Sequence, residues 1–168
     1  DMDAAFTGLH WSGHDDGQRA FAGTTQYLTL GLVDANGLID FEEISLIFDF
    51  EGPDPERDQQ KLSFSGSNNT FWTDDAYLVI DPACNDEDDS TCGATVSTNE
   101  TGLPWIMVTF GFKFSWDWPD ADLGDVALEY KQLGSPEITR MIFTQHTFRV
   151  ENDLVLDADT YVVNDVQA

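Results

Sequence analysis

The sequence predicts an all-β protein: an antiparallel β-sandwich of the jelly-roll or Ig-like type, with about nine or ten strands. Several segments alternate apolar and polar residues, a pattern that buries one face of a strand. Turn-forming Gly, Pro, Asn and Asp separate these segments at short intervals. No long stretch shows the helical period. We therefore expect a single sandwich domain over residues 24–168, preceded by an extended N-terminal arm over residues 1–23.

The clearest strand is WIMVTFGFKFSWDW, residues 105–118, in which every even-numbered position is apolar. Pro119 is expected to end it, because proline cannot donate a hydrogen bond to the sheet. Trp116 and Trp118 either continue its buried face or lie exposed. The residues expected to form the core are Ile106, Val108, Phe110, Phe112 and Phe114.

Shorter alternating segments predict the remaining strands. The turn DANG, residues 34–37, favours a hairpin between the first two of them, because Asn-Gly supplies positive φ angles. Phe41 is out of phase with the apolar positions that follow, which indicates a β-bulge at Glu42 or Glu43. The expected strands are residues 24–33, 38–51, 61–66, 76–81, 94–98, 125–133, 136–151 and 154–166.

The charge of the chain is extreme, with 32 acidic residues against 7 Lys and Arg and a net charge of −25. Phosphates would be repelled, which excludes nucleic acid and anionic membrane surfaces as partners. The self-repulsion of such a chain is relieved by molar salt, where the Debye length falls to about 3 Å, or by bound divalent cations. The composition therefore indicates either a halophilic protein or a calcium-loaded extracellular one.

Several features predict export. No apolar run is long enough to span a membrane, and the chain begins at Asp1, as expected of a mature product after removal of a signal peptide. Cys84 and Cys92 flank a short acidic loop and are expected to form a disulfide, which an oxidising compartment permits. Asn68 and Asn99 each begin an N-x-[ST] sequon, the acceptor motif for glycosylation.

The loop DPACNDEDDSTC, residues 81–92, is the strongest candidate for calcium, the one cofactor that the sequence suggests. Carboxylates gathered on one cross-linked loop supply the hard oxygen ligands that Ca²⁺ prefers. The alternative is an acidic loop that is merely solvated and held by its disulfide. The candidate ligands are Asp81, Asp86, Glu87, Asp88 and Asp89.

No catalytic motif is present: the sequence lacks G-x-S-x-G, H-E-x-x-H and the P-loop. Paired carboxylates carry little information in a chain with 32 acids, so we expect a non-enzyme. Exposed aromatic side chains on a β-sandwich can stack against sugar rings, so a glycan is a candidate ligand. The candidates for this role are Trp72, Trp105 and Trp116 or Trp118.

Three short segments near the N-terminus carry a resemblance to a known family. Ala5-Phe6, then Phe21-Ala22-Gly23-Thr24, then Leu28-Thr29-Leu30 resemble the start of mature TasA/camelysin-type proteins, apart from an insertion at residues 25–27 and a missing Asp. The resemblance implies a jelly roll, and fibre-forming members of that family pass an N-terminal strand into the neighbouring subunit. It covers only this part of the chain.

The apolar character of the N-terminal arm also agrees with strand exchange between subunits. An apolar segment on so acidic a chain either folds back as the protein's own edge strand or is donated to a neighbour by β-strand addition. We therefore expect a structural subunit that assembles with copies of itself into an extracellular filament, surface layer or shell. A carbohydrate-binding module and a virion capsid subunit are the alternatives. The assembly residues expected in the arm are Ala5, Phe6, Leu9 and Trp11.

Overall fold

The computed structural model describes residues 5–11, 19–50, 60–86, 90–98, 100–117, 121–122, 125–143 and 149–151. Two short 3₁₀ turns accompany the strands in these ranges, η1 (Leu38–Asp40) and η2 (Pro82–Asn85). The described strands are β1 (Ala5–Trp11), β2 (Arg19–Phe21), β3 (Gln26–Val33), β4 (Phe41–Phe50), β5 (Gln60–Ser65), β6 (Thr70–Trp72), β7 (Leu78–Ile80), β8 (Gly93–Thr98), β9 (Pro104–Phe114), β10 (Ala121–Asp122), β11 (Asp125–Gln132), β12 (Ile138–Phe143) and β13 (Arg149–Glu151).

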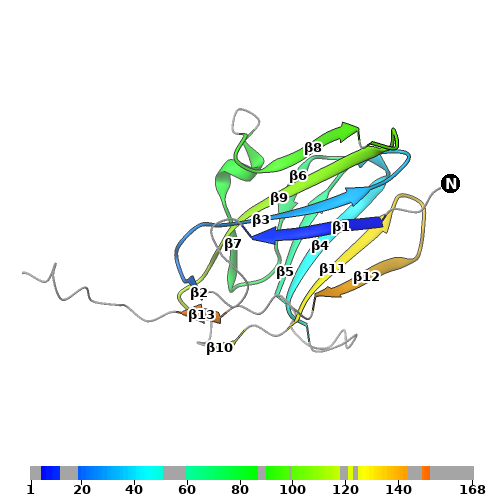
Figure 1. Ribbon diagram of the computed structural model, residues 1–168. Helices are drawn as coiled ribbons and strands as arrows, with labels where there is room; N and C mark the ends of the chain where they lie inside the picture. Colours follow the sequence, from blue (N-terminus) through cyan, green and yellow to red (C-terminus); the bar gives the residue numbers. More distant parts are fainter. Residues whose placement is uncertain are drawn as a thin grey trace, which may run out of the picture.

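Two five-stranded sheets pack face to face and form the sandwich (Figure 1). The first sheet has the order β1-β3-β9, with β7 and β8 both paired to the far side of β9. The second sheet has the order β12-β11-β4-β5-β6, and every pair in both sheets is antiparallel. Three short strands make a third sheet, β10-β13-β2. The predicted antiparallel β-sandwich is therefore confirmed.

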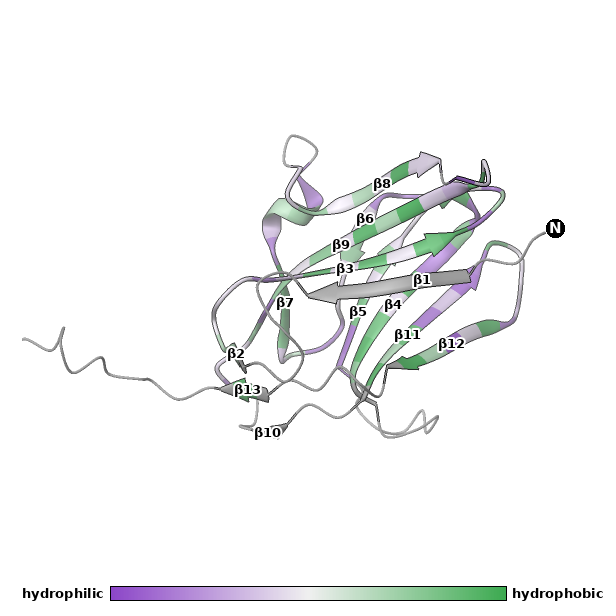
Figure 2. Cartoon of the chain, viewed as in Figure 1, coloured by the Kyte–Doolittle hydropathy of each residue, from purple (hydrophilic) through white to green (hydrophobic). Residues whose placement is uncertain are grey.

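Strand β9 supplies the centre of the core, as its alternation predicts. All five of its expected core residues, from Ile106 to Phe114, are fully buried. Ring contacts join the two sheets across the core, for example Phe48 of β4 with Phe112 and Phe71 of β6 with Phe110. The hydrophobic colouring of β3, β4, β9 and β11 in Figure 2 follows these buried faces.

The predicted hairpin at residues 34–37 is wrong. The strands on either side of this turn lie in different sheets, because β3 pairs with β1 and β9 while β4 pairs with β11 and β5. Each strand has an inner face of buried, mostly apolar residues that must be covered by the opposite sheet. The chain therefore crosses the core edge here through Gly37, at φ 79°, and the turn η1.

The predicted β-bulge is confirmed at Glu42. Lys131 of β11 lies opposite Glu43 and Gln132 lies opposite Phe41, which leaves Glu42 as the extra residue. The bulge returns Phe41 to the buried face, where it makes an edge-on ring contact with Tyr130.

Several strands differ from the prediction in their boundaries or number. Strand β9 ends at Phe114, because Ser115 and the residues after it form a turn in which the Ser115 side chain accepts from the Asp117 amide. Trp116 is consequently exposed and does not extend the buried face. The segment 136–151 contains two strands, and a three-residue strand, β6, was not expected. The strand expected at 154–166 lies outside the described residues.

Candidate functional site

The N-terminal strand β1 is the outer strand of the first sheet. It pairs antiparallel with β3, in a register that sets Leu9 opposite Leu30 and Trp11 opposite Leu28. In the sheet order of the described strands, β3 is its one pairing partner. All four expected assembly residues, Ala5, Phe6, Leu9 and Trp11, therefore lie on one edge strand that the chain folds back onto its own body (Figure 1).

The β1–β3 pairing is interrupted near its start. The register shifts between Phe6 and Gly8, so that Thr7 has no partner residue on β3. A bulge weakens the ladder locally and bends the strand. Beyond Trp11 the next described strand begins at Arg19.

The opposite edge of the first sheet is built differently. It is divided between β7, which pairs with the end of β9, and β8, which pairs with its start. The predicted disulfide between Cys84 and Cys92 is present and joins the ends of the segment that connects these two strands. It lies against Gly111 of β9, where a Cβ atom would stand 2.8 Å from the Cys84 sulfur and 3.0 Å from that of Cys92.

The acidic loop next to this disulfide contains the calcium candidates. Asp81 caps η2 by accepting from the Ala83 amide at 3.1 Å, and its other oxygen accepts from Thr25 at 3.1 Å. Asp86 is exposed. Glu87, Asp88 and Asp89 lie outside the described residues, within which no group of three or more His, Cys, Asp or Glu side chains could hold a metal ion. Calcium binding stays a prediction.

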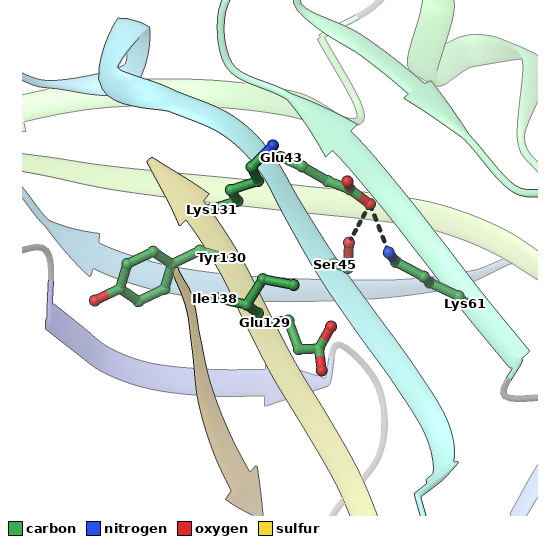
Figure 3. A pocket seen from close by; sticks show the side chains of 7 residues that line it. All are labelled: Glu43, Ser45, Lys61, Glu129, Tyr130, Lys131 and Ile138. Atoms are coloured by element: carbon green, nitrogen blue, oxygen red, sulfur yellow. Dashed lines mark hydrogen bonds and ion pairs between the residues drawn. The ribbon is translucent and has the colours of Figure 1, made fainter. Parts of the chain in front are cut away.

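The outer face of the second sheet carries a polar cluster around Glu43 (Figure 3). The Glu43 carboxylate accepts from Ser45 and Ser63, each at 2.9 Å, and pairs with Lys61 at 2.7 Å. Burial raises the pKa of Glu43, but these hydrogen bonds and the charge of Lys61 outweigh it, so the pKa lies below its ordinary value of 4.5. The cavity beside the cluster, about 30 Å³, has room for a water molecule and not for a substrate.

A buried carboxylate, Asp34, lies where the chain crosses between the sheets. One of its oxygens accepts from the Asn36 and Gly37 amides, at 2.7 and 3.0 Å, and the other from the Gln132 side chain. Burial, with the nearby Asp40 carboxylate, raises the pKa of Asp34 despite these hydrogen bonds. These contacts give Asp34 a structural role in fixing the turn.

The tryptophan candidates occupy different parts of the surface. Trp105 and Trp116 are exposed on and after β9, and Trp118 lies outside the described residues. Trp72 lines an open groove of about 430 Å³ on the outer face of the second sheet. The other residues that line this groove are Glu42, Glu43, Ser65, Ser67, Asn68 and Thr70.

Of the two sequon asparagines, Asn68 and Asn99, only the first lies within the described residues. Asn68 is exposed in the turn between β5 and β6, where an attached glycan would reach solvent. Asn99 lies outside the described residues. Glycosylation stays a prediction for both.

Comparison with known proteins gives distant structural similarities and no match of sequence. No protein-family model and no curated protein matches the chain. The chain is similar to the crystal structure of BcpA, the major pilin subunit of Bacillus cereus, at 6% identity and a TM-score of 0.39, covering 88% of this chain and 40% of that one. It is also similar to a 35 kDa C-terminal fragment of the major pilin GBS80 of Streptococcus agalactiae, at 11% identity and a TM-score of 0.33.

The second match covers 89% of this chain and 56% of the fragment. The chain thus spans about half the length of the pilin structures that it resembles. Within the described residues no helix is long and apolar enough to cross a lipid bilayer.

Proposed function

We propose that this chain is a non-enzymatic structural subunit that polymerises outside the cell by donating its N-terminal strand to the next copy. The observation that supports this proposal is the position of β1: it is an N-terminal edge strand, paired with β3 and separated in sequence from the strands that follow. The resemblance of this segment to TasA/camelysin-type proteins agrees with the proposal but is not needed for it.

Replacing β1 on its own β3 by the β1 of a second copy changes few of the interactions that stabilise the sheet. If β1 leaves β3 and the β1 of a second copy takes its place, the same backbone hydrogen bonds and the same side-chain contacts form again. The main difference in free energy is then the entropy of association, which a high subunit concentration offsets. Because the donor and acceptor surfaces differ, each copy has one of each, and the contact repeats from copy to copy, as an open polymer unless the rotation between copies closes it.

The charge of the chain sets the conditions for this assembly. Copies with a net charge of −25 repel each other at low salt. Molar salt screens this repulsion, and calcium on the acidic loop around Asp81 and Asp86 would reduce it at millimolar concentration. Both solvents therefore belong in the test of assembly.

A locking disulfide tests strand donation. In the closed form His10 pairs with Thr29, and the Thr29 hydroxyl bonds Thr109 on the outer surface of the first sheet. Oxidised H10C/T29C should hold β1 on its own β3 and abolish polymers in electron micrographs, while the T29C single variant, which loses the same hydroxyl, should polymerise normally. Removal of residues 1–12 should also abolish assembly. Polymers formed by the locked protein would contradict strand donation.

The form of the polymer distinguishes the structural alternatives. Filaments, layers and closed shells differ in the angle between successive subunits, so electron microscopy of the unmodified chain separates a filament or layer from a capsid-like shell. A folded monomer in both molar NaCl and millimolar CaCl₂ would contradict all three proposed assemblies: filament, layer and shell.

Carbohydrate binding is the second candidate, favoured by the groove at Trp72. An indole ring beside Asn68, Thr70 and the carboxylate of Glu42 combines a stacking surface with hydrogen-bonding groups, as sugar sites require. The W72A variant should then lose binding on a glycan array while the removal of residues 1–12 leaves it intact. The W105A variant serves as a control, because Trp105 lies on the other sheet.

A further inference from the structure

A second edge strand, β12, has the features of a docking surface for another copy of this chain. It is the outer strand of the second sheet, and its six residues pair with β11 in an uninterrupted register from Ile138 to Phe143. An edge strand presents a row of backbone N–H and C=O groups toward the outside of the sheet. No bulge interrupts this row between Ile138 and Phe143.

The side chains of β12 are apolar and exposed on both faces of the strand. Met141 lies opposite the core residue Leu128 on the inner face and is 39% exposed. Ile138 and Ile142 lie on the outer face and are 58% and 44% exposed. Figure 2 shows hydrophobic colouring toward both ends of the strand. A partner strand that paired here would therefore cover apolar side chains above and below the sheet.

The one charge on β12 does not protect this edge. Arg140 pairs with the mostly buried Glu129 of β11, through both its Nε and a terminal nitrogen, so its guanidinium is held over its own sheet and not at the free edge. Natural edge strands usually avoid unwanted pairing through charges that face the edge, proline, bulges or short length. Within the described β12 these devices are missing.

The distribution of charge indicates which partner this strand accepts. From Lys131 to Arg149 the sequence has a single acid, Glu137, although acids make up 32 of the 168 residues. The same segment holds three of the chain's 7 basic residues. A second copy, which is repelled over most of the surface, meets its weakest repulsion here. From these observations we infer that β12 pairs antiparallel with β12 of a second copy, about a two-fold axis.

Side-chain pairing selects a register for this contact. An axis perpendicular to the sheet sets one residue directly opposite its own copy. If that residue were Arg140, two like charges would face each other, which destabilises an antiparallel pair. If it is Met141, the two methionines meet and Arg140 lies opposite Ile142, whose apolar surface suits the stem of the arginine. The register centred on Met141 is therefore favoured. It joins the second sheets of the two copies into one continuous sheet.

This contact is weaker than a permanent dimer interface and serves a different purpose from strand donation. Stable interfaces bury at least about 1,200 Å², more than a single six-residue edge supplies. The pairing therefore depends on concentration and acts between subunits that a polymer already holds close together. It adds a lateral contact to the proposed polymer, so that neighbouring polymers associate side by side.

The test uses the locked variant H10C/T29C, in which donation of β1 is blocked. Sedimentation in molar NaCl is expected to show a reversible monomer–dimer equilibrium for this protein. M141E should weaken the dimer by at least about tenfold, because position 141 lies opposite its own copy across the axis and two carboxylates would then face each other. V96E is the matched control, since Val96 is exposed on the other six-residue edge strand, β8, and adds the same charge.

A cysteine at Met141 gives an independent readout of the register. M141C, in a chain without the H10C/T29C lock, should form an intermolecular disulfide across the axis. S97C on β8 should not form one. A locked protein that stays monomeric, equal effects of M141E and V96E, or equal cross-linking of M141C and S97C would overturn the inference. The inference is separable from the proposed function, because loss of filaments on locking β1 is observed whether or not β12 pairs.

Discussion

The two six-residue edge strands, β8 and β12, end their sheets in opposite ways. Strand β8 has the sequence GATVST, with Val96 as its one large apolar residue, and it begins directly after Cys92 of the disulfide. Strand β12 has the sequence ITRMIF, and no disulfide anchors it in the described structure. One edge is polar and covalently fixed, and the other is apolar and held by β11 alone in the described sheet.

Under the proposed function, this difference selects the edges at which a second copy would pair. A small polar edge offers little apolar area to another strand, and the disulfide restricts the connection that leads into β8. An apolar edge next to an acid-poor segment offers both area and low repulsion. The first sheet also has β1 at its other end, so the molecule combines one fixed edge with two edges suited to assembly.

Removing the disulfide should have the largest effect on the fixed edge. The C84S/C92S variant loses a cross-link that closes a short loop, which is expected to lower the free energy of unfolding by about 2–3 kcal/mol. Urea denaturation of the variant and the parent protein measures this loss. Equal stability of the two would show that β8 does not need the disulfide, and the contrast with β12 would then rest on composition alone.

The contact between the disulfide and Gly111 gives the next effect. In G111A the added methyl group would lie within 3.0 Å of both sulfur atoms, so the edge must shift at a cost of about 1–3 kcal/mol. The same substitution in the C84S/C92S background should cost less, because the two unlinked serine side chains are smaller and can move apart. A double-mutant cycle from thermal unfolding measures this coupling, and strict additivity would contradict the proposed contact.

On the opposite edge, the ion pair of Arg140 and Glu129 anchors β12 to β11. R140Q leaves a mostly buried carboxylate without its cation and should cost about 1–3 kcal/mol. The matched control is R140Q/E129Q, which removes both charges and should recover much of the loss. If R140Q alone were as stable as the parent protein, the charge of Arg140 would be free to protect the edge.

The smallest effect concerns the exposed pair of Lys61 and Glu43 on the same sheet. K61M should cost about 0.2–1 kcal/mol, since both side chains remain partly in solvent. The pKa of Glu43 is lowered in the folded protein, so its contribution is present above the unfolded pKa and disappears as pH falls through the folded value. The difference in stability between K61M and the parent protein should therefore shrink toward acid pH, measured by urea denaturation across that range.

The core and the fixed edge could be predicted from the sequence because their signals are local. The alternation of β9 identified its buried residues, the spacing of Cys84 and Cys92 identified the disulfide, and the phase of Phe41 located the bulge. Each of these features depends on residues that are close in sequence, and each is fixed by sterics or covalent chemistry.

The pairing of strands could not be predicted in the same way. The turn before Leu38 has the residues of a hairpin, but the partners of β3 and β4 are chosen by burial against distant strands. Strand β6 was missed because three residues are too few to show a period. The edge position of β12 depends on the whole sheet order, although its apolar, acid-poor sequence was available as a signal.

The most direct test of strand donation mixes two single-cysteine variants, H10C and T29C, under assembly conditions and then oxidises them. His10 and Thr29 are paired residues of β1 and β3, so a cross-link between different chains requires β1 of one copy to lie on β3 of another. We expect a disulfide-linked dimer that contains one chain of each variant. No such dimer in the mixture, together with efficient internal cross-linking of H10C/T29C, would show that β1 stays on its own sheet and would contradict the account.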